Sequence, residues 1–247
     1  MENENNFYEQ ERSLEQQGTA GISLSRYTAK TFLLMFLGLM VSFGMAAFIA
    51  YTWPGFYFIR SIYNLAGNML PILLLVLQLA LTLGMTSQME KISVGTATVF
   101  FFLHCLVMGF VVGTWLLLFT MESVVLVFAA TALYFGGMAV FGYVTGIDLS
   151  RMRNILITGL IFLIIMNLAM WFIPAVQVAE QVVCTIGVIL FLGYTAYDTQ
   201  MIKRFYAAFQ GDEEMLRKAS VLAALELCLD FVNMFLYLLR LLGKKRN

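Results

Sequence analysis

The chain has 247 residues, of which 61% are hydrophobic and 12% are charged, and its mean hydropathy is +0.83. Soluble domains are about half apolar and about a quarter charged, so this composition excludes a typical soluble protein and indicates a membrane protein with several spans. Because the 15 basic and 15 acidic residues cancel, we expect partners in or near the lipid bilayer and no nucleic-acid partner.

The N-terminal segment is polar, with acidic, basic and amide side chains interspersed over residues 1–28. It contains neither the apolar core nor the cleavage site of a signal peptide. We therefore expect residues 1–28 to form a flexible cytoplasmic tail, followed by a single transmembrane domain over residues 29–243.

Seven segments contain the roughly 20 mostly apolar residues that a membrane-spanning helix needs. Pro, Gly or clusters of charged and polar residues separate them. In chain order, the predicted spans are 29–51, 68–88, 93–118, 122–146, 151–173, 177–202 and 219–242. Strands would need alternating segments of about ten residues, and backbone groups in lipid must be paired internally, so we predict an all-α membrane protein with seven transmembrane helices.

The distribution of Lys and Arg predicts the orientation of the chain. With a cytoplasmic N-terminus, the only basic residue in the outer loops before the last span is Arg60. The inner loops then hold Lys91, Arg151, Arg153, Lys203, Arg204, Arg217 and Lys218. A seventh crossing places Arg240 and Lys244–Arg246 outside, against the rule, so either the last segment does not fully cross or short C-terminal charge tolerates translocation.

Several polar or reactive side chains within the spans have simple structural interpretations. The three cysteines form no CxxC pair or metal-ligand spacing, which is typical of packing residues; they are Cys105, Cys184 and Cys228. The single histidine, His104, is more often a core residue than a ligand in this setting. Asn167 and Gln78 each interrupt an apolar span and are expected to form interhelical hydrogen bonds. We place Glu180 near the outer boundary and interpret Asp148, with Ser150, as a loop or capping acid.

The last predicted span carries a polar stripe. Glu226, Asp230, Asn233, Tyr237 and Arg240 follow one another at intervals of four, three, four and three residues, which places them on one helical face. Ionisable groups in lipid cost at least a few kcal/mol unless they face the interior, so we expect a central helix whose stripe faces a water-accessible seam. The predicted opposite face carries Leu225, Leu229, Val232, Leu236 and Leu239.

A second carboxylate, Asp198, lies in the sixth predicted span within GYTAYDTQMIKRFY. From this helix it can meet Asp230, and two carboxylates in a water-poor pocket cannot both ionise cheaply. We expect the pair to share a proton at low pH and to separate, or to take up a cation, at higher pH. The alternative interpretation is that Asp198 pairs with Lys203 or Arg204 and caps a helix end.

The segment YDTQMIKRFY, followed by a short acidic loop and LELCLDFVNMFLYLLRLLG, resembles the C-terminal signature of the Bax inhibitor-1, or transmembrane Bax inhibitor motif, family and in particular its bacterial members. Weaker similarities, such as FFLHCLVMGF, extend the resemblance to about residues 30 to 243. The resemblance implies six helices wrapped around a central seventh. It also implies a pH-dependent calcium leak governed by two aspartates, which by motif position are Asp198 and Asp230.

The second predicted span departs from the family pattern. Bacterial members carry a glutamate in the apolar part of this helix and an arginine near its cytoplasmic end, where this chain has Gln78 and only Lys91. Lysine lacks the bidentate fork of arginine, so Lys91 is a candidate gating cation with a different geometry. Calcium normally takes six to eight oxygen ligands, so Asp198 and Asp230, with Glu226 and a few carbonyls, predict a weak Ca²⁺ site that suits passage better than storage.

Three functions compete at this stage. The first is a pH-sensitive calcium leak channel of a bacterial plasma membrane, gated by Asp198 and Asp230. The second is a non-transporting scaffold that regulates a membrane protease or a stress or death pathway through a membrane protein partner. An intramembrane aspartyl protease also pairs two carboxylates, but its GxGD motif is absent before Asp230, so we expect no catalytic residues, no enzyme activity and no cofactor beyond weakly bound Ca²⁺.

Overall fold

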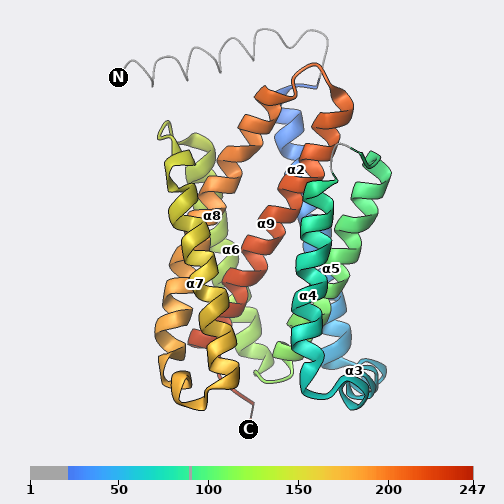
Figure 1. The fold of residues 1–247 in the computed structure, drawn as a ribbon, viewed down its shortest axis with the longest axis vertical. Coiled ribbons are helices and arrows are strands. Elements are labelled where there is room, and N and C mark those ends of the chain that lie inside the picture. Colours follow the sequence, from blue (N-terminus) through green and yellow to red (C-terminus); the bar gives the residue numbers. More distant parts are fainter. Residues whose placement is uncertain (1–21, 89–90, 247) are drawn as a thin grey trace.

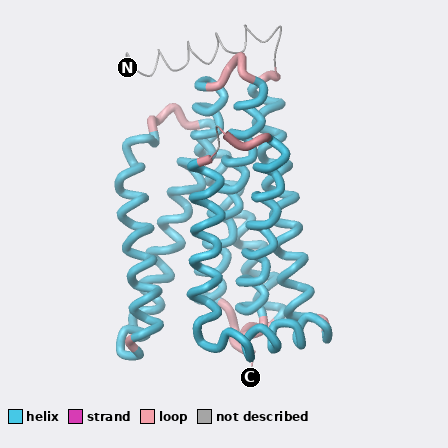
Figure 2. The backbone as a smooth tube through the Cα atoms, turned by 45° about the vertical axis from the view of Figure 1, so that its right-hand side comes forward, coloured by secondary structure: helices cyan, strands magenta, loops and turns pink. Residues whose placement is uncertain are grey.

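The computed structural model describes residues 22–88 and 91–246, which form helices joined by short connections at the two ends of a bundle, without named strands in this part of the chain (Figures 1 and 2). The long helices are α2 (Leu24–Tyr51), α4 (Leu70–Ser87), α5 (Val94–Leu116), α6 (Met121–Val144), α7 (Arg153–Phe172), α8 (Glu180–Ala208) and α9 (Glu213–Leu242). The shorter elements are α3 (Trp53–Ala66) and three 3-10 helices, η1 (Gly67–Met69), η2 (Leu149–Met152) and η3 (Pro174–Ala179). We call the end where α9 begins, at the top of Figure 1, the upper end and the end where α9 finishes the lower end.

Within the described residues, six helices are long and apolar enough to cross a membrane, namely α2, α5, α6, α7, α8 and α9. This confirms the predicted all-α membrane class. The apolar stretch of α4, Ile72–Ser87, is shorter. The predicted count of seven spans therefore depends on α4, and six spans are supported by length and composition.

The sequence prediction missed α3, which occupies a region expected to be a break. Pro54 and Gly55 mark the start of this helix, because proline is compatible with a first helical turn, where its missing N–H has no intrahelical acceptor. The Thr52 hydroxyl caps the helix by accepting a hydrogen bond from the Gly55 amide at 3.1 Å. The short helix α3, followed by η1, thus connects α2 to α4 at the lower end (Figure 1).

Two helices begin earlier than predicted. Helix α2 starts at Leu24 instead of near residue 29, with Ser23 as its N-cap, so only residues 1–21 of the predicted tail lie outside the described residues. Helix α9 starts at Glu213, within the stretch predicted to be a charged loop. The Asp212 side chain caps the helix, and the acidic side chains of its first turn stabilise it by interacting favourably with the positive end of the helix dipole. Ion pairs one turn apart join Glu213 with Arg217 at 3.3 Å and Glu214 with Lys218 at 2.8 Å.

Helix α9 is the most enclosed of the six long apolar helices. Of its most apolar window, 78% is buried, against 11% to 50% for the other five. It packs mainly against α2, α5, α6 and α8, while α4 packs on α5 and α7 packs on α8. A ring of six helices around the seventh is therefore only partly formed: four helices pack on α9, and α4 and α7 flank its remaining side (Figure 1).

The C-terminal residues return to the connection between α5 and α6 at the lower end. The Arg246 amide donates to the Leu118 carbonyl at 2.9 Å, and the Thr120 amide donates to the Lys244 carbonyl at 3.0 Å. Helix α9 runs from the upper to the lower end of the bundle (Figure 1). The last apolar segment thus does not stop short, and Arg240 lies near the end opposite the start of α2.

Candidate functional site

A cavity of about 1130 Å³ extends along α9. Its walls come from α4, α5, α7, α8 and α9, and most of the lining side chains are apolar. In the described part of the chain, the flanking helices α4 and α7 have no extensive contact with each other, so the cavity lies between them along the side of α9 that is not covered by α2 and α6. The predicted polar seam is this cavity.

All five residues of the predicted polar stripe line the cavity, from Glu226 about midway along α9 to Arg240 at the lower end. The predicted opposite face was partly wrong, because Leu229, Val232 and Leu236 also line the cavity. The cavity is wider than the polar stripe, so side chains that flank the stripe face it too. Leu225 and Leu239, in contrast, are buried in the packed core.

The structure brings the two predicted aspartates together. Asp198 on α8 and Asp230 on α9 lie close enough to interact electrostatically, and both line the cavity although they are only 7% and 3% exposed. Glu226, one helical turn before Asp230, acts electrostatically on both. We call Asp198, Glu226 and Asp230 the acidic centre. Ionised carboxylates only accept hydrogen bonds, so a direct hydrogen bond between the two aspartates would need a proton on one of them.

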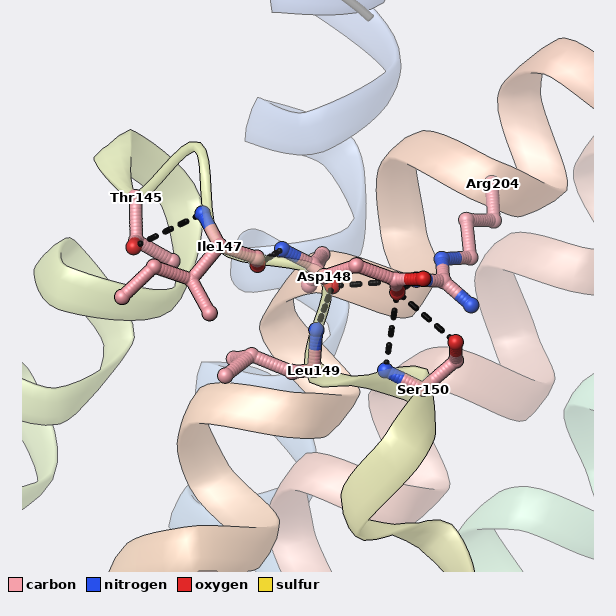
Figure 3. Close-up of polar contacts among 7 residues, drawn as sticks. Thr145, Ile147, Asp148, Leu149, Ser150 and Arg204 are labelled. Carbon is pink, nitrogen blue, oxygen red and sulfur yellow. Dashed lines mark hydrogen bonds and ion pairs between the residues drawn. The ribbon is translucent and has the colours of Figure 1, made fainter. Parts of the chain in front are cut away.

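The helical turn that follows Asp198 is held by the connection between α6 and α7 (Figure 3). The Gln200 side chain accepts a hydrogen bond from the Leu149 amide at 2.9 Å and donates one to the Ile147 carbonyl at 2.8 Å. The Arg204 guanidinium donates to Gln200 at 3.1 Å and pairs with Asp148. The motif residue Gln200 was not singled out from the sequence, yet it anchors the segment that carries Asp198.

The alternative interpretation of Asp198 as a helix cap does not fit its position. Asp198 lies well before the end of α8 at Ala208. Arg204 pairs with Asp148 instead, and the Lys203 amino group lies 4.6 Å from the centroid of the Tyr143 ring.

Asp148 has the capping role predicted from the sequence. Its carboxylate accepts hydrogen bonds from the Ser150 hydroxyl at 2.7 Å and the Ser150 amide at 3.0 Å (Figure 3). These bonds, together with the Arg204 guanidinium, hold the pKa of the Asp148 carboxyl below its ordinary value. This exposed carboxylate therefore belongs to the α6–α7 connection and stands outside the cavity lining.

A second polar group occupies the lower end of the cavity. The Arg240 Nε donates to Glu180 Oε1 at 3.1 Å, and its Nη1 donates to Asn167 Oδ1 at 3.0 Å. Asn167 Nδ2 donates in turn to the Tyr237 hydroxyl at 2.9 Å, and the guanidinium lies 5.3 Å from the centroid of the Trp115 ring. We call these five residues the arginine clasp. The predicted interhelical role of Asn167 is confirmed, whereas the pairing of Arg240 with Glu180 was missed because its partners come from separate helices.

The α4–α5 wall holds the remaining polar candidates. Thr82 Oγ1 and His104 Nε2 are hydrogen-bonded at 3.2 Å, so His104 is a buried residue that joins two helices. Its Nδ1 has no hydrogen-bond partner among the described residues. Gln78 lines the cavity, but the described part of the chain provides no hydrogen bond for its amide, so its predicted interhelical bond is not seen.

The candidate gating cation Lys91 is exposed in the turn after α4 and is not among the residues that line the cavity. The basic side chain that lines the upper part of the cavity is Arg153, from the start of α7. In the sequence analysis, Arg153 contributes only to the predicted orientation of the chain. Its position depends on how α7 packs against α8, which the local sequence does not reveal.

Metal-binding capacity at the acidic centre is limited. Among the described residues, no group of three or more His, Cys, Asp or Glu side chains is arranged to hold a metal ion. The three cysteines are free and buried, consistent with their predicted packing role. A calcium ion at Asp198 and Asp230 would thus depend on water or carbonyl oxygens for most of its six to eight ligands.

Comparison with known proteins identifies the family. A sequence profile described as inhibitor of apoptosis-promoting Bax1 matches residues 24–247. Similar proteins include the inner membrane protein YbhL of Escherichia coli K12, 37% identical over 174 residues covering 70% of this chain and 74% of YbhL. A protein of Borreliella burgdorferi is 36% identical over 223 residues, or 90% of this chain and 94% of that protein. Given its helices and these relatives, the chain is a multi-pass integral membrane protein that belongs to the Bax inhibitor-1 family.

Proposed function

We propose that this protein is a pH-sensitive calcium leak channel of a bacterial plasma membrane, with a cytoplasmic N-terminus and with Asp198 and Asp230 as its proton-controlled latch. The observation that carries the proposal is the proximity of these two buried carboxyl groups on the wall of one large cavity. The resemblance of the YDTQ and LDFVN segments to the family signature supports the same assignment.

The latch works through one proton. With a shared proton, the pair carries one negative charge and its hydrogen bond joins α8 to α9. Once the proton leaves, two unit charges about 4 Å apart repel by about 4 kcal/mol at an effective dielectric constant of about 20. The helices then separate, or a cation replaces the proton between them, so proton and calcium compete for one place.

The remaining cavity residues suit passage. The polar side chains Asn233 and Tyr237 continue the hydrophilic track from the acidic centre toward the lower end. A permeating ion must bind well enough to enter and weakly enough to leave. Two carboxylates without a complete set of oxygen ligands meet this condition.

The test is calcium uptake into proteoliposomes between about pH 6 and about pH 8, the range that brackets neutrality. Wild-type protein is expected to show uptake that changes steeply with pH, whereas Asp198→Asn and Asp230→Asn should flatten the profile because neither retains a titrating pair. Asp148→Asn is the matched control, since it removes a carboxylate outside the cavity lining.

Two results would contradict the proposal. If both cavity variants keep the wild-type pH profile, the aspartate pair is not the latch. If correctly folded wild-type protein gives no uptake at any pH, a non-transporting scaffold becomes the better assignment, and a stably co-purifying membrane partner should then survive loss of both aspartates.

A further inference from the structure

Two charged groups of opposite character share one helix and one cavity. Asp230 and Arg240 are ten residues apart on α9, which corresponds to about 15 Å along the helix axis. Both line the cavity. A cation that leaves the acidic centre toward the lower end therefore moves toward a guanidinium group.

Three other helices hold Arg240 in place at the lower end. Its hydrogen-bond partners Asn167 and Glu180 belong to α7 and α8, and the Trp115 ring beneath it belongs to α5. Only 11% of the Arg240 side chain is exposed, compared with 41% of the Glu180 side chain. The arginine is thus the enclosed member of the pair, and the glutamate is its solvent-facing counter-charge.

We propose that Arg240 is the charge barrier that closes the lower end of the cavity against cations, and that Glu180 sets its height by partly neutralising the guanidinium. A fixed positive charge in a water-poor passage repels cations far more strongly than one in bulk water. The inference rests on the conduction proposed above and names the residue that limits it.

Substitutions at Arg240 separate charge from packing. Arg240→Gln removes the charge but keeps an amide that can hydrogen-bond to Asn167. Calcium uptake is expected to rise on the order of tenfold, because the barrier to cation passage is lower without the positive charge. Arg240→Lys keeps the charge and loses the planar fork, so uptake should stay near the wild-type rate. Equal effects of the two variants would show a purely structural role and overturn the proposal.

Glu180→Gln provides an independent arm. The arginine retains its bond to Asn167 and its contact with Trp115, so its charge stays in place while its neutralising partner is lost. Uptake is expected to fall several-fold, in proportion to the higher barrier. A rise in uptake would indicate that the position of Arg240, and not its charge, closes this end.

A second readout does not depend on conduction. Asn233 lines the cavity between the two charged groups, and among the described residues its amide donates only to the Leu229 carbonyl of its own helix. Asn233→Cys can be labelled from the lower end with a cationic and an anionic membrane-impermeant thiol reagent. Protein without this substitution gives the background, because the three native cysteines are buried.

With Arg240 present, the anionic reagent should react faster than the cationic one, and Arg240→Gln should reduce this preference on the order of tenfold. An unchanged reagent preference would contradict the charge barrier. If wild-type protein gives no uptake but the preference still responds to Arg240→Gln, the channel assignment fails while the barrier assignment stands.

Discussion

The acidic centre and the arginine clasp are built from the same helix but balance their charges in opposite ways. At the acidic centre, the charged groups that act on Asp198 and Asp230 are other carboxylates, and Asp230 Oδ2 is buried with no hydrogen-bond partner among the described residues. At the clasp, Arg240 is paired with a carboxylate and hydrogen-bonded to an amide.

This contrast has a physical consequence. Buried like charges are relieved by binding a proton or a cation, so the acidic centre responds to its surroundings. A buried charge that is paired and hydrogen-bonded keeps its geometry, because breaking the pair leaves an uncompensated charge. One group is thus suited to switching and the other to holding helices in place.

The largest expected effect comes from glycines that support each group. A Cβ on Gly142 of α6 would lie 2.2 Å from the Ala196 carbonyl oxygen, just before Asp198 on α8, and a Cβ on Gly187 would lie 2.7 Å from the Tyr237 ring of the clasp. We expect Gly142→Ala to cost about 3 kcal/mol by overpacking and to disturb the pH response. Gly187→Ala should disturb the clasp instead.

Thermal unfolding in detergent and uptake across pH would measure these effects. Gly136→Ala is the matched control on α6, since nothing lies within 4 Å of its Cβ, and it should be neutral or stabilise by about 0.5–1 kcal/mol through helix propensity. If Gly142→Ala behaves like this control, the close contact of α6 with α8 does not position Asp198.

Removing one carboxylate from each group should have a smaller effect on stability, with opposite signs in the acidic centre and the arginine clasp. Asp230→Asn removes one of the like charges. At near-neutral pH it should therefore leave the free energy of unfolding unchanged or raise it by up to about 1 kcal/mol. Glu180→Gln removes the partner of Arg240 and should destabilise by about 1–2 kcal/mol, less than a fully buried pair because Glu180 is partly exposed. Chemical denaturation of both variants at one pH tests this, and equal signs would remove the distinction between the groups.

The smallest effect is expected at Asp148, outside both groups. Its folded-state pKa is lowered by Ser150 and Arg204, so its contribution to stability is present above the ordinary value of 3.8 and is lost as pH falls through the folded-state value. Because the carboxylate is 56% exposed, Asp148→Asn should cost at most about 1 kcal/mol at neutral pH.

The same denaturation experiment in acid provides the check on Asp148. The difference between wild type and Asp148→Asn should disappear once the wild-type carboxyl is protonated. A difference that persists in acid would mean that the carboxamide disturbs the α6–α7 connection by some route other than charge.

Local patterns along the chain were sufficient for much of the fold. Long apolar segments predicted six of the membrane-spanning helices, and the three-to-four spacing from Glu226 to Arg240 predicted which face of α9 lines the cavity. The prediction failed at α3, a helix that starts at Trp53 with Pro54 in its first turn, because proline and glycine at this point predict a break between spans. It also failed at the start of α9, where charged residues form the first helical turns.

Helical periodicity is a property of neighbouring residues, so the amino-acid order alone specifies the class of fold, the polar face of α9 and two acids on adjacent helices. Which groups meet across helices depends on crossing positions and side-chain packing between segments far apart in the chain. For that reason only the three-dimensional structure brought Asp198 and Asp230 close together, paired Arg240 with Glu180 and left Lys91 away from the cavity.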